Sequence, residues 1–184
     1  MDRTISYKKI IVIGCIVSIL IGVLFHFAFE FTGKNNIVGI FTPVNESVWE
    51  HLKLIFVPFT LFSIAFYFYS KKKFSNMLLV TLFANVVGMF TVVTMSYIGT
   101  LILGGENMVY NIVSYVISMI VTFSIFYLGI YNEEFIEDTK DSTALGACAL
   151  TLMFAIFALN TFSPIKLDIT RDPTTKTYGI DKRV

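Results

Sequence analysis

Two pairs of ionisable residues, each spaced four apart, are the part of this sequence best suited to chemistry. His26 and Glu30 form one pair, and Glu46 and Glu50 form the other. A spacing of four places both members of a pair on one face of an α-helix. His51 follows Glu50 directly and points about 100° away from it on a helix. Imidazole and carboxylate groups gathered in this way can bind a divalent metal or exchange a proton with a substrate.

The two pairs belong to the facing ends of two apolar segments, residues 9–31 and 52–69, which we expect to be antiparallel helices. A connection of about a dozen residues joins them, and Asn45 is the expected N-cap of the second. Counted from this connection, Glu30 and Glu46 are expected at similar depth in the membrane. His26 and Glu50 are expected about one helical turn deeper. The expected cluster, which is also the expected metal or acid/base set, comprises His26, Glu30, Glu46 and Glu50.

Several carboxylates placed so close to hydrocarbon need compensation, because like charges repel and each charge costs a few kcal/mol there. The sequence leaves open a divalent metal, a shared proton, or a basic partner such as Lys53, Arg171 or Lys176. One imidazole with two or three carboxylates suits zinc, manganese or iron. In a purely structural alternative, Glu46 and Glu50 complement the positive dipole at a helix start and the histidines make interfacial hydrogen bonds.

Further polar residues are expected around this cluster. Asn111, Tyr115 and Tyr97 lie near the ends of their apolar segments, on the same membrane face. Trp49 is the single tryptophan, and anchoring at the membrane interface is its expected role. The expected surrounding set is His51, Asn45, Lys53, Trp49, Tyr97, Asn111, Tyr115 and Arg171.

The composition is that of a membrane protein. Of the 184 residues, 55% are hydrophobic and 15% are charged, whereas soluble domains carry about a quarter charged residues. Five apolar stretches have the roughly 17–25 residues that a helix needs to cross the bilayer. We therefore predict an all-α, polytopic transmembrane bundle of about five membrane-spanning helices. The stretches cover residues 9–31, 52–69, 77–103, 108–131 and 144–162.

The chain is expected to divide into a transmembrane helical domain, residues 1–163, and a polar tail, residues 164–184. Lys8 and Lys9 precede the first apolar segment, and three lysines at residues 71–73 follow the second. Because positive residues are enriched on the cytoplasmic side, this pattern favours a cytoplasmic N-terminus. Five crossings then place the tail outside the cytoplasm, on the face of the cluster. We expect the tail to pack over that face with Arg171 meeting a carboxylate, and a disordered terminus is the alternative.

The net charge of +1 and the lack of any basic block argue against nucleic acid as a partner. Membrane lipids, a small-molecule or lipid-like ligand and a second copy of the chain are the partners that the sequence leaves open.

Two segments resemble the hallmark of a family of small bacterial polytopic membrane proteins of unknown function. They read His-Phe-Ala-Phe-Glu-Phe-Thr-Gly over residues 26–33 and Asn-Glu-Ser-Val-Trp-Glu-His-Leu-Lys over residues 45–53. The tail over residues 172–180 is similar to the family's ending, so the resemblance covers nearly the whole chain. It implies a bacterial plasma membrane and no particular activity. Phe29 departs from the tyrosine expected there, which weakens any role for a hydroxyl group at this position.

The leading hypothesis is a metal- or carboxylate-dependent membrane enzyme that acts on a lipid-like or small interfacial substrate. Glu50 and His26 would be the innermost ligands or acid/base groups, with Glu46 and Glu30 nearer the water. Whether the protein is an enzyme stays open. The alternatives are a small transporter or ion-coupled carrier that works as an oligomer, and a non-catalytic accessory subunit.

Overall fold

The computed structural model describes residues 3–70, 73–74, 76–105, 107–132 and 140–180. Two of the lysines that bear on orientation, Lys71 and Lys72, lie outside the described residues. The last four residues of the predicted tail, 181–184, also lie outside them.

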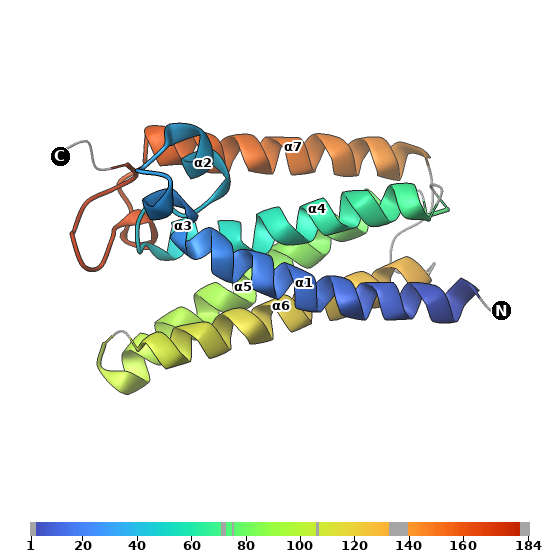
Figure 1. Cartoon of the computed structure of the whole chain (residues 1–184), viewed down its shortest axis with the longest axis horizontal. Helices are drawn as coiled ribbons and strands as arrows, with labels where there is room; N and C mark the ends of the chain where they lie inside the picture. The colour runs from blue at the N-terminus through green and yellow to red at the C-terminus, as the bar shows by residue number, and fades with distance from the viewer. Residues whose placement is uncertain (1–2, 71–72, 75, 106, 133–139, 181–184) are drawn as a thin grey trace.

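Over the described residues the chain is helical, with an isolated β-bridge and no strand. Five long helices run along a common axis (Figure 1), and each is long and apolar enough to cross a membrane. The long helices are α1 (Arg3–Phe31), α4 (Lys53–Tyr69), α5 (Met77–Leu103), α6 (Met108–Tyr131) and α7 (Lys140–Phe162). The short elements are α2 (Asn36–Phe41), α3 (Val48–His51) and the 3-10 turn η1 (Asp168–Thr170). The predicted all-α, five-helix bundle is confirmed.

The helix boundaries differ from the predicted ones where polar residues extend a helix beyond its apolar stretch. The ends of α5 and α6 fall on the predicted residues. Helices α1 and α7 begin six and four residues earlier than the predicted starts at residues 9 and 144. Hydropathy marks the part of a helix that suits hydrocarbon, and a helix can continue past it into the headgroup region.

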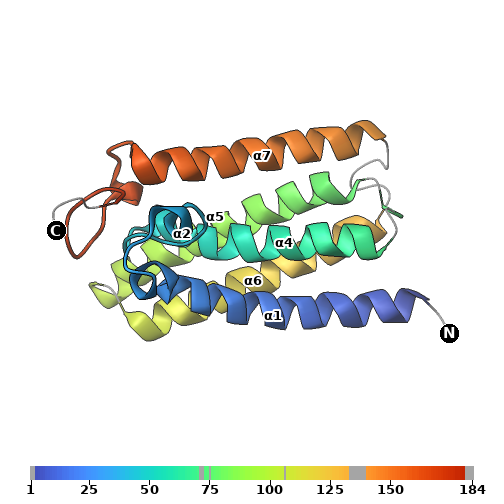
Figure 2. The same cartoon turned by 45° about the horizontal axis from the view of Figure 1, so that its top comes forward.

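The short elements all lie at one end of the bundle, which we call the site end. This end carries α2, α3, η1 and the C-terminal segment, together with the turn between α5 and α6, as Figures 1 and 2 show. The start of α1 and the end of α4 lie at the opposite end. The short elements thus gather over the end of the bundle where the predicted site residues lie.

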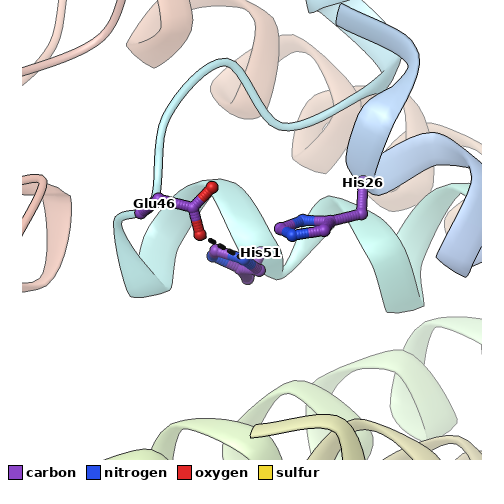
Figure 3. A group of neighbouring side chains, drawn as sticks. All are labelled: His26, Glu46 and His51. Carbon is purple, nitrogen blue, oxygen red and sulfur yellow. Dashed lines mark ion pairs between the residues drawn. The ribbon is translucent and has the colours of Figure 1, made fainter. Parts of the chain in front are cut away.

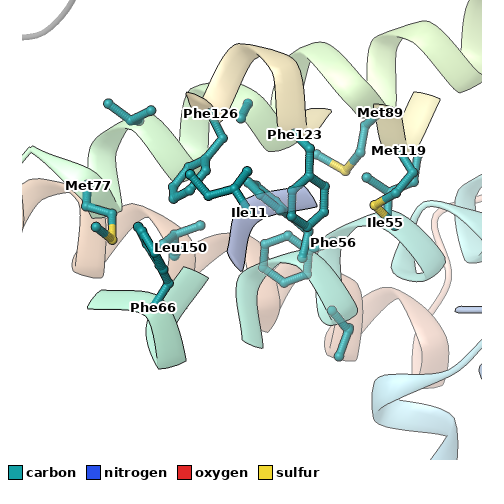
Figure 4. Close-up of a cluster of buried hydrophobic side chains, with 14 of the residues drawn as sticks. Ile11, Ile55, Phe56, Phe66, Met77, Met89, Met119, Phe123, Phe126 and Leu150 are labelled. Atoms are coloured by element: carbon teal, nitrogen blue, oxygen red, sulfur yellow. The ribbon is translucent and has the colours of Figure 1, made fainter. Parts of the chain in front are cut away.

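Helix α4 is the centre of the bundle. It is the most buried of the five candidate spans and packs against α1, α5 and α6. Phe56 and Phe66 of α4 lie in a buried cluster with Phe123 and Phe126 of α6 and Met77 of α5 (Figure 4). Lipid tails are as apolar as these side chains, so close packing, rather than escape from water, holds such a bundle together.

A hydrogen bond between α4 and α5 and a glycine between α5 and α6 bring these helices close together. The amide of Asn85 on α5 donates to the hydroxyl oxygen of Thr60 on α4, at 3.0 Å. Gly88 on α5 faces Thr122 on α6, and an added Cβ would lie 1.8 Å from the threonine hydroxyl. Small residues and side-chain hydrogen bonds of this kind are typical of membrane helix interfaces.

Gly146 sets the distance between α7 and α5, and its replacement should destabilise the bundle. An added Cβ would lie 2.4 Å from the backbone nitrogen of Leu79, and backbone atoms cannot move aside as a side chain can. We expect Gly146→Leu to lower the free energy of unfolding by about 1–3 kcal/mol, measured by unfolding in detergent. Gly105→Leu is the control, because a Cβ there meets no atom within 4 Å. Equal losses in the two variants would contradict this account.

Candidate functional site

The structure separates the four residues of the predicted cluster. Of the described residues, His26 and Glu46 come together with His51 as a group that could hold a metal. Glu50 pairs with Lys53 in the protein interior, and Glu30 is exposed on α1. Among the described residues, the converging group therefore differs from the predicted cluster: it contains His51, and it does not contain Glu50 or Glu30.

The reason for this difference lies in the connection between α1 and α4. The expected cluster assumes that Glu46 and Glu50 share one face of the second helix, but the helical residues begin only at Val48, so Glu46 lies before the helix. The backbone of Leu52, where α3 meets α4, is itself helical. Ser47, rather than Asn45, caps α3 through its side chain, which accepts from the backbone N–H of Glu50 at 3.3 Å. On this short helix His51 faces α1, while Glu50 points about 100° away into the interior.

The three converging side chains come from two parts of the chain. His26 extends from α1 toward the imidazole of His51, which lies between it and Glu46 (Figure 3). One ligand atom from each residue lies within 4.8 Å of the other two. The distance from His51 Nε2 to Glu46 Oε2 is 3.5 Å, and the two imidazole centroids are 5.1 Å apart. We call this group the His-His-Glu site.

A backbone contact fixes the tautomer of His51. Its Nδ1 lies 2.9 Å from the carbonyl oxygen of Ser47, and because a carbonyl can only accept, Nδ1 carries the hydrogen. In a neutral ring the lone pair is then on Nε2, which faces a carboxylate oxygen of Glu46. Two acceptors this close repel unless a metal ion or a proton lies between them. Metal-binding histidines commonly donate their other ring N–H to a backbone carbonyl in the same way.

Two buried polar atoms at this site have no hydrogen-bond partner among the residues that the structure describes. They are Nδ1 of His26 and Oγ of Ser114, and Ser114 is only 2% exposed. A buried polar atom without a partner costs about 1–3 kcal/mol, so such atoms call for an explanation. A ligand or an ordered water beside them would provide one.

A small pocket adjoins the His-His-Glu site. Its volume is about 70 Å³, which is room for a few water molecules. Glu46 and His51 line one side, and Ser96, Asn111 and Ser114 of α5 and α6 line the other. The pocket therefore combines a carboxylate and an imidazole on one wall with uncharged hydrogen-bonding groups on the facing wall.

The predicted surrounding residues on α5 and α6 have different positions. Asn111 and Tyr115 line the pocket, whereas Tyr97 is 47% exposed and is not among the lining residues. The hydroxyl of Tyr115 lies within hydrogen-bond distance of two α1 carbonyls, Ser18 O at 3.3 Å and Ile19 O at 3.2 Å. Tyr115 thus ties α6 to α1 behind the site, while Asn111 remains a candidate for contact with a ligand.

Lys53 and Glu50 form a buried ion pair at the base of α4. Their residues are 0% and 1% exposed, and Lys53 Nζ lies 2.6 Å from Glu50 Oε2. The ammonium group also has three oxygen acceptors: Gly39 O of α2 at 2.9 Å, Thr42 O at 3.3 Å and Thr161 Oγ1 of α7 at 2.6 Å. Lys53 was one of the three basic partners that the sequence left open, and in the structure it pairs with the carboxylate of Glu50. This pair joins α2, α4 and α7.

Asn45 and Trp49 hold the site end together. The amide of Asn45 donates to the carbonyl of Gly179 in the tail at 3.0 Å, and its Oδ1 accepts from the backbone N–H of Ser47 at 2.9 Å. The ring of Trp49 packs on Phe157 of α7, with centroids 5.2 Å apart. Both residues serve packing between segments rather than the His-His-Glu site.

The tail packs against the site end, but through Asp172 rather than Arg171. Oδ2 of Asp172 accepts from the backbone N–H of Glu46 at 3.1 Å, whereas Arg171 is exposed. Burial would raise the pKa of Asp172, but hydrogen bonds from the N–H groups of Thr175, Glu46 and Thr174 outweigh it and lower that pKa. The ionised carboxylate therefore holds the tail beside one of the three site residues.

Replacing Asp172 by asparagine should loosen the tail. An amide has one oxygen, but both oxygens of Asp172 accept from backbone N–H groups, so one donor would lose its partner at a cost of about 1–3 kcal/mol. We expect faster hydrogen exchange at the Glu46 amide and faster proteolysis of the tail in Asp172→Asn. Asp168→Asn, at an exposed position, should leave both rates unchanged. If the two variants behave alike, Asp172 does not hold the tail.

Sequence reasoning missed Ser114 and Thr161. Ser114 shares a pocket with the predicted Asn111, and the only signal for it was its position three residues after Asn111 on the same apolar segment. Thr161 lies 108 residues from its partner Lys53, and no local pattern connects them.

The five apolar helices and the polar site at one end define a multi-pass helical membrane protein. The model of a family of unknown function (DUF6512) matches residues 1–180, and the chain belongs to this family. This confirms the resemblance to a family without an assigned function. No curated protein and no solved structure matches the chain.

Proposed function

We propose that this protein is a membrane metalloprotein that binds one zinc-like ion through His26, Glu46 and His51. The observation that carries the proposal is the approach of His51 Nε2 to a Glu46 carboxylate oxygen at 3.5 Å, with His51 Nδ1 2.9 Å from the carbonyl oxygen of Ser47. The third group, His26, lies beside them, and its buried Nδ1 has no hydrogen-bond partner in the described part of the chain.

The ligand types and their separation favour zinc. Two imidazoles and one carboxylate are a ligand set of catalytic zinc sites, in which the fourth position stays open. With zinc–ligand bonds of about 2.0–2.1 Å, tetrahedral ligands lie about 3.4 Å apart, close to the distance between His51 and Glu46. The same three ligand types also occur in non-haem iron(II) sites, which makes iron the second metal to test.

The pocket beside the site favours hydrolytic chemistry. A metal of this kind lowers the pKa of a bound water and so supplies a nucleophile near neutral pH. Ser114 and Asn111 line the pocket beside Glu46 and His51 and offer hydrogen bonds to a polar substrate. We infer a metal-dependent hydrolase that acts on a small interfacial or lipid-like substrate.

We place the His-His-Glu site at the extracytoplasmic face of a bacterial plasma membrane. Lys8 and Lys9 lie near the start of α1, and Lys73 follows the end of α4. Both helix ends lie at the end of the bundle opposite the site (Figure 1), and positive residues favour the cytoplasmic side. A protease added to intact cells should then remove an epitope attached to the C-terminus. Cleavage only after the cells are broken would reverse the orientation.

Metal analysis of the purified protein tests the metal site. After chelation and dialysis against zinc, we expect one zinc per chain in the wild type and none in His26→Ala/His51→Ala. Glu30→Gln is the matched control, because Glu30 lies one turn from His26 yet outside the group of converging ligands. No bound zinc in the wild type, or equal zinc in all three proteins, would overturn the proposal.

A proton-coupled carrier that works as an oligomer is the second candidate. The contact between His51 and Glu46 also favours this candidate, because a protonated imidazole of His51 would form an ion pair with the Glu46 carboxylate at 3.5 Å. In this case the protein would bind no metal, and flux into proteoliposomes would depend on Glu46.

A further inference from the structure

An apolar groove lies on the outside of the bundle, between α1 and α6 and away from the site end. Its volume is about 540 Å³. Cys15 and Ile19 of α1 and Phe123 of α6 line it, and most of the other lining side chains are also apolar, with Lys8, Ser124 and Tyr127 as the exceptions. This groove faces the region where lipid surrounds the protein, because its rim residues Val12 and Ile16 are exposed.

The groove is about one lipid leaflet long. It extends from Lys8 to Ile19, three helical turns that cover about 16 Å. The hydrocarbon core of a bilayer is about 30 Å thick, so one leaflet is about half of that. A partner helix would cover the whole thickness, whereas a lipid acyl chain has the length of this groove.

The end of the groove that lies nearest the N-terminus is positively charged. Lys8 lines it, and its ammonium group lies 5.9 Å from the ring centroid of Tyr127. Cation–π contact with this ring holds the charge over the groove. No acidic side chain is among the lining residues in the described part of the chain.

We propose that the groove is a binding site for one anionic glycerophospholipid, with an acyl chain between α1 and α6 and the phosphate at Lys8. The acyl chain alone gives little selectivity, because lipid tails are as apolar as the groove. Selectivity comes from the ammonium group beside the phosphate, and one such charge near the membrane surface gives about a fivefold preference for an anionic lipid.

Native mass spectrometry of the detergent-solubilised protein tests the headgroup contact. We expect the wild type to retain phosphatidylglycerol about fivefold better than phosphatidylcholine, as one nearby charge implies. Lys8→Gln should lose this preference and Lys9→Gln should keep it, because Lys9 does not line the groove. Equal loss in both variants would show a general surface charge effect and overturn the proposal, as would displacement of the lipid by inorganic phosphate.

The two cysteines of the chain provide a matched test of the groove itself. Cys15 lines the groove, whereas Cys148 is exposed on α7. Cys15→Trp should fill the groove and reduce the retained phosphatidylglycerol severalfold, and Cys148→Trp should retain as much as the wild type. The same retention in both variants would mean that the lipid binds elsewhere.

Discussion

Replacing Lys53 by methionine should lower the free energy of unfolding by about 3–5 kcal/mol, because it leaves Glu50 charged and buried without its partner. The ammonium group is fully buried, and it satisfies carbonyls of α2 and the following segment as well as Thr161 of α7. Each of these oxygens would lose a donor. The loss should appear as a lower midpoint of unfolding in detergent.

The double variant Glu50→Leu/Lys53→Met distinguishes the ion pair from simple packing. Replacing both partners of a buried pair by apolar residues is often neutral or stabilising, so we expect much of the lost stability to return. Lys166→Met at an exposed tail position is the control and should change little. A double variant as unstable as Lys53→Met would show that the pair itself is not the source of the loss.

Replacing His51 by alanine should weaken zinc binding by about 100-fold or more. Loss of a group that only orients a ligand costs about 10–100-fold in metal affinity, and loss of a ligand should cost at least as much. The measurement is a competitive zinc titration with a chromophoric chelator.

Two further variants test whether the zinc ligands are the three residues that converge in the structure or the four that the sequence predicts. Glu30→Gln should bind zinc as the wild type does, and Glu46→Gln should lose affinity as His51→Ala does, because Glu46 belongs to the converging group and Glu30 does not. Undiminished binding by His51→Ala, with loss in Glu30→Gln, would restore the set expected from the sequence.

The sequence predicts the long helices well because their apolar length is a local property. The 27 residues of α5 and the 24 of α6 match their apolar stretches. Helix α2 escaped prediction, since its six residues carry too little periodicity. The residues of α3 were expected to open the second helix after Asn45, but the helix begins at Val48 after Ser47, which leaves Glu46 outside it.

The segment around Glu50 shows what residue types can predict and what they cannot. The need for compensation of its charge could be predicted, and Lys53 was among the candidate partners. The choice between a metal and a lysine depends on rotation about α3 and on Thr161 of α7, which no spacing in the sequence fixes. For the same reason His51 was expected beside the site rather than in it.

X-ray absorption at the zinc edge of the zinc-loaded protein shows whether His26, Glu46 and His51 bind the ion. We expect two imidazole nitrogens at about 2.0–2.1 Å and a carboxylate oxygen at about 2.0–2.2 Å, with one imidazole fewer in His51→Ala. A spectrum with one imidazole or none in the wild type, or one that His51→Ala leaves unchanged, would contradict this expectation.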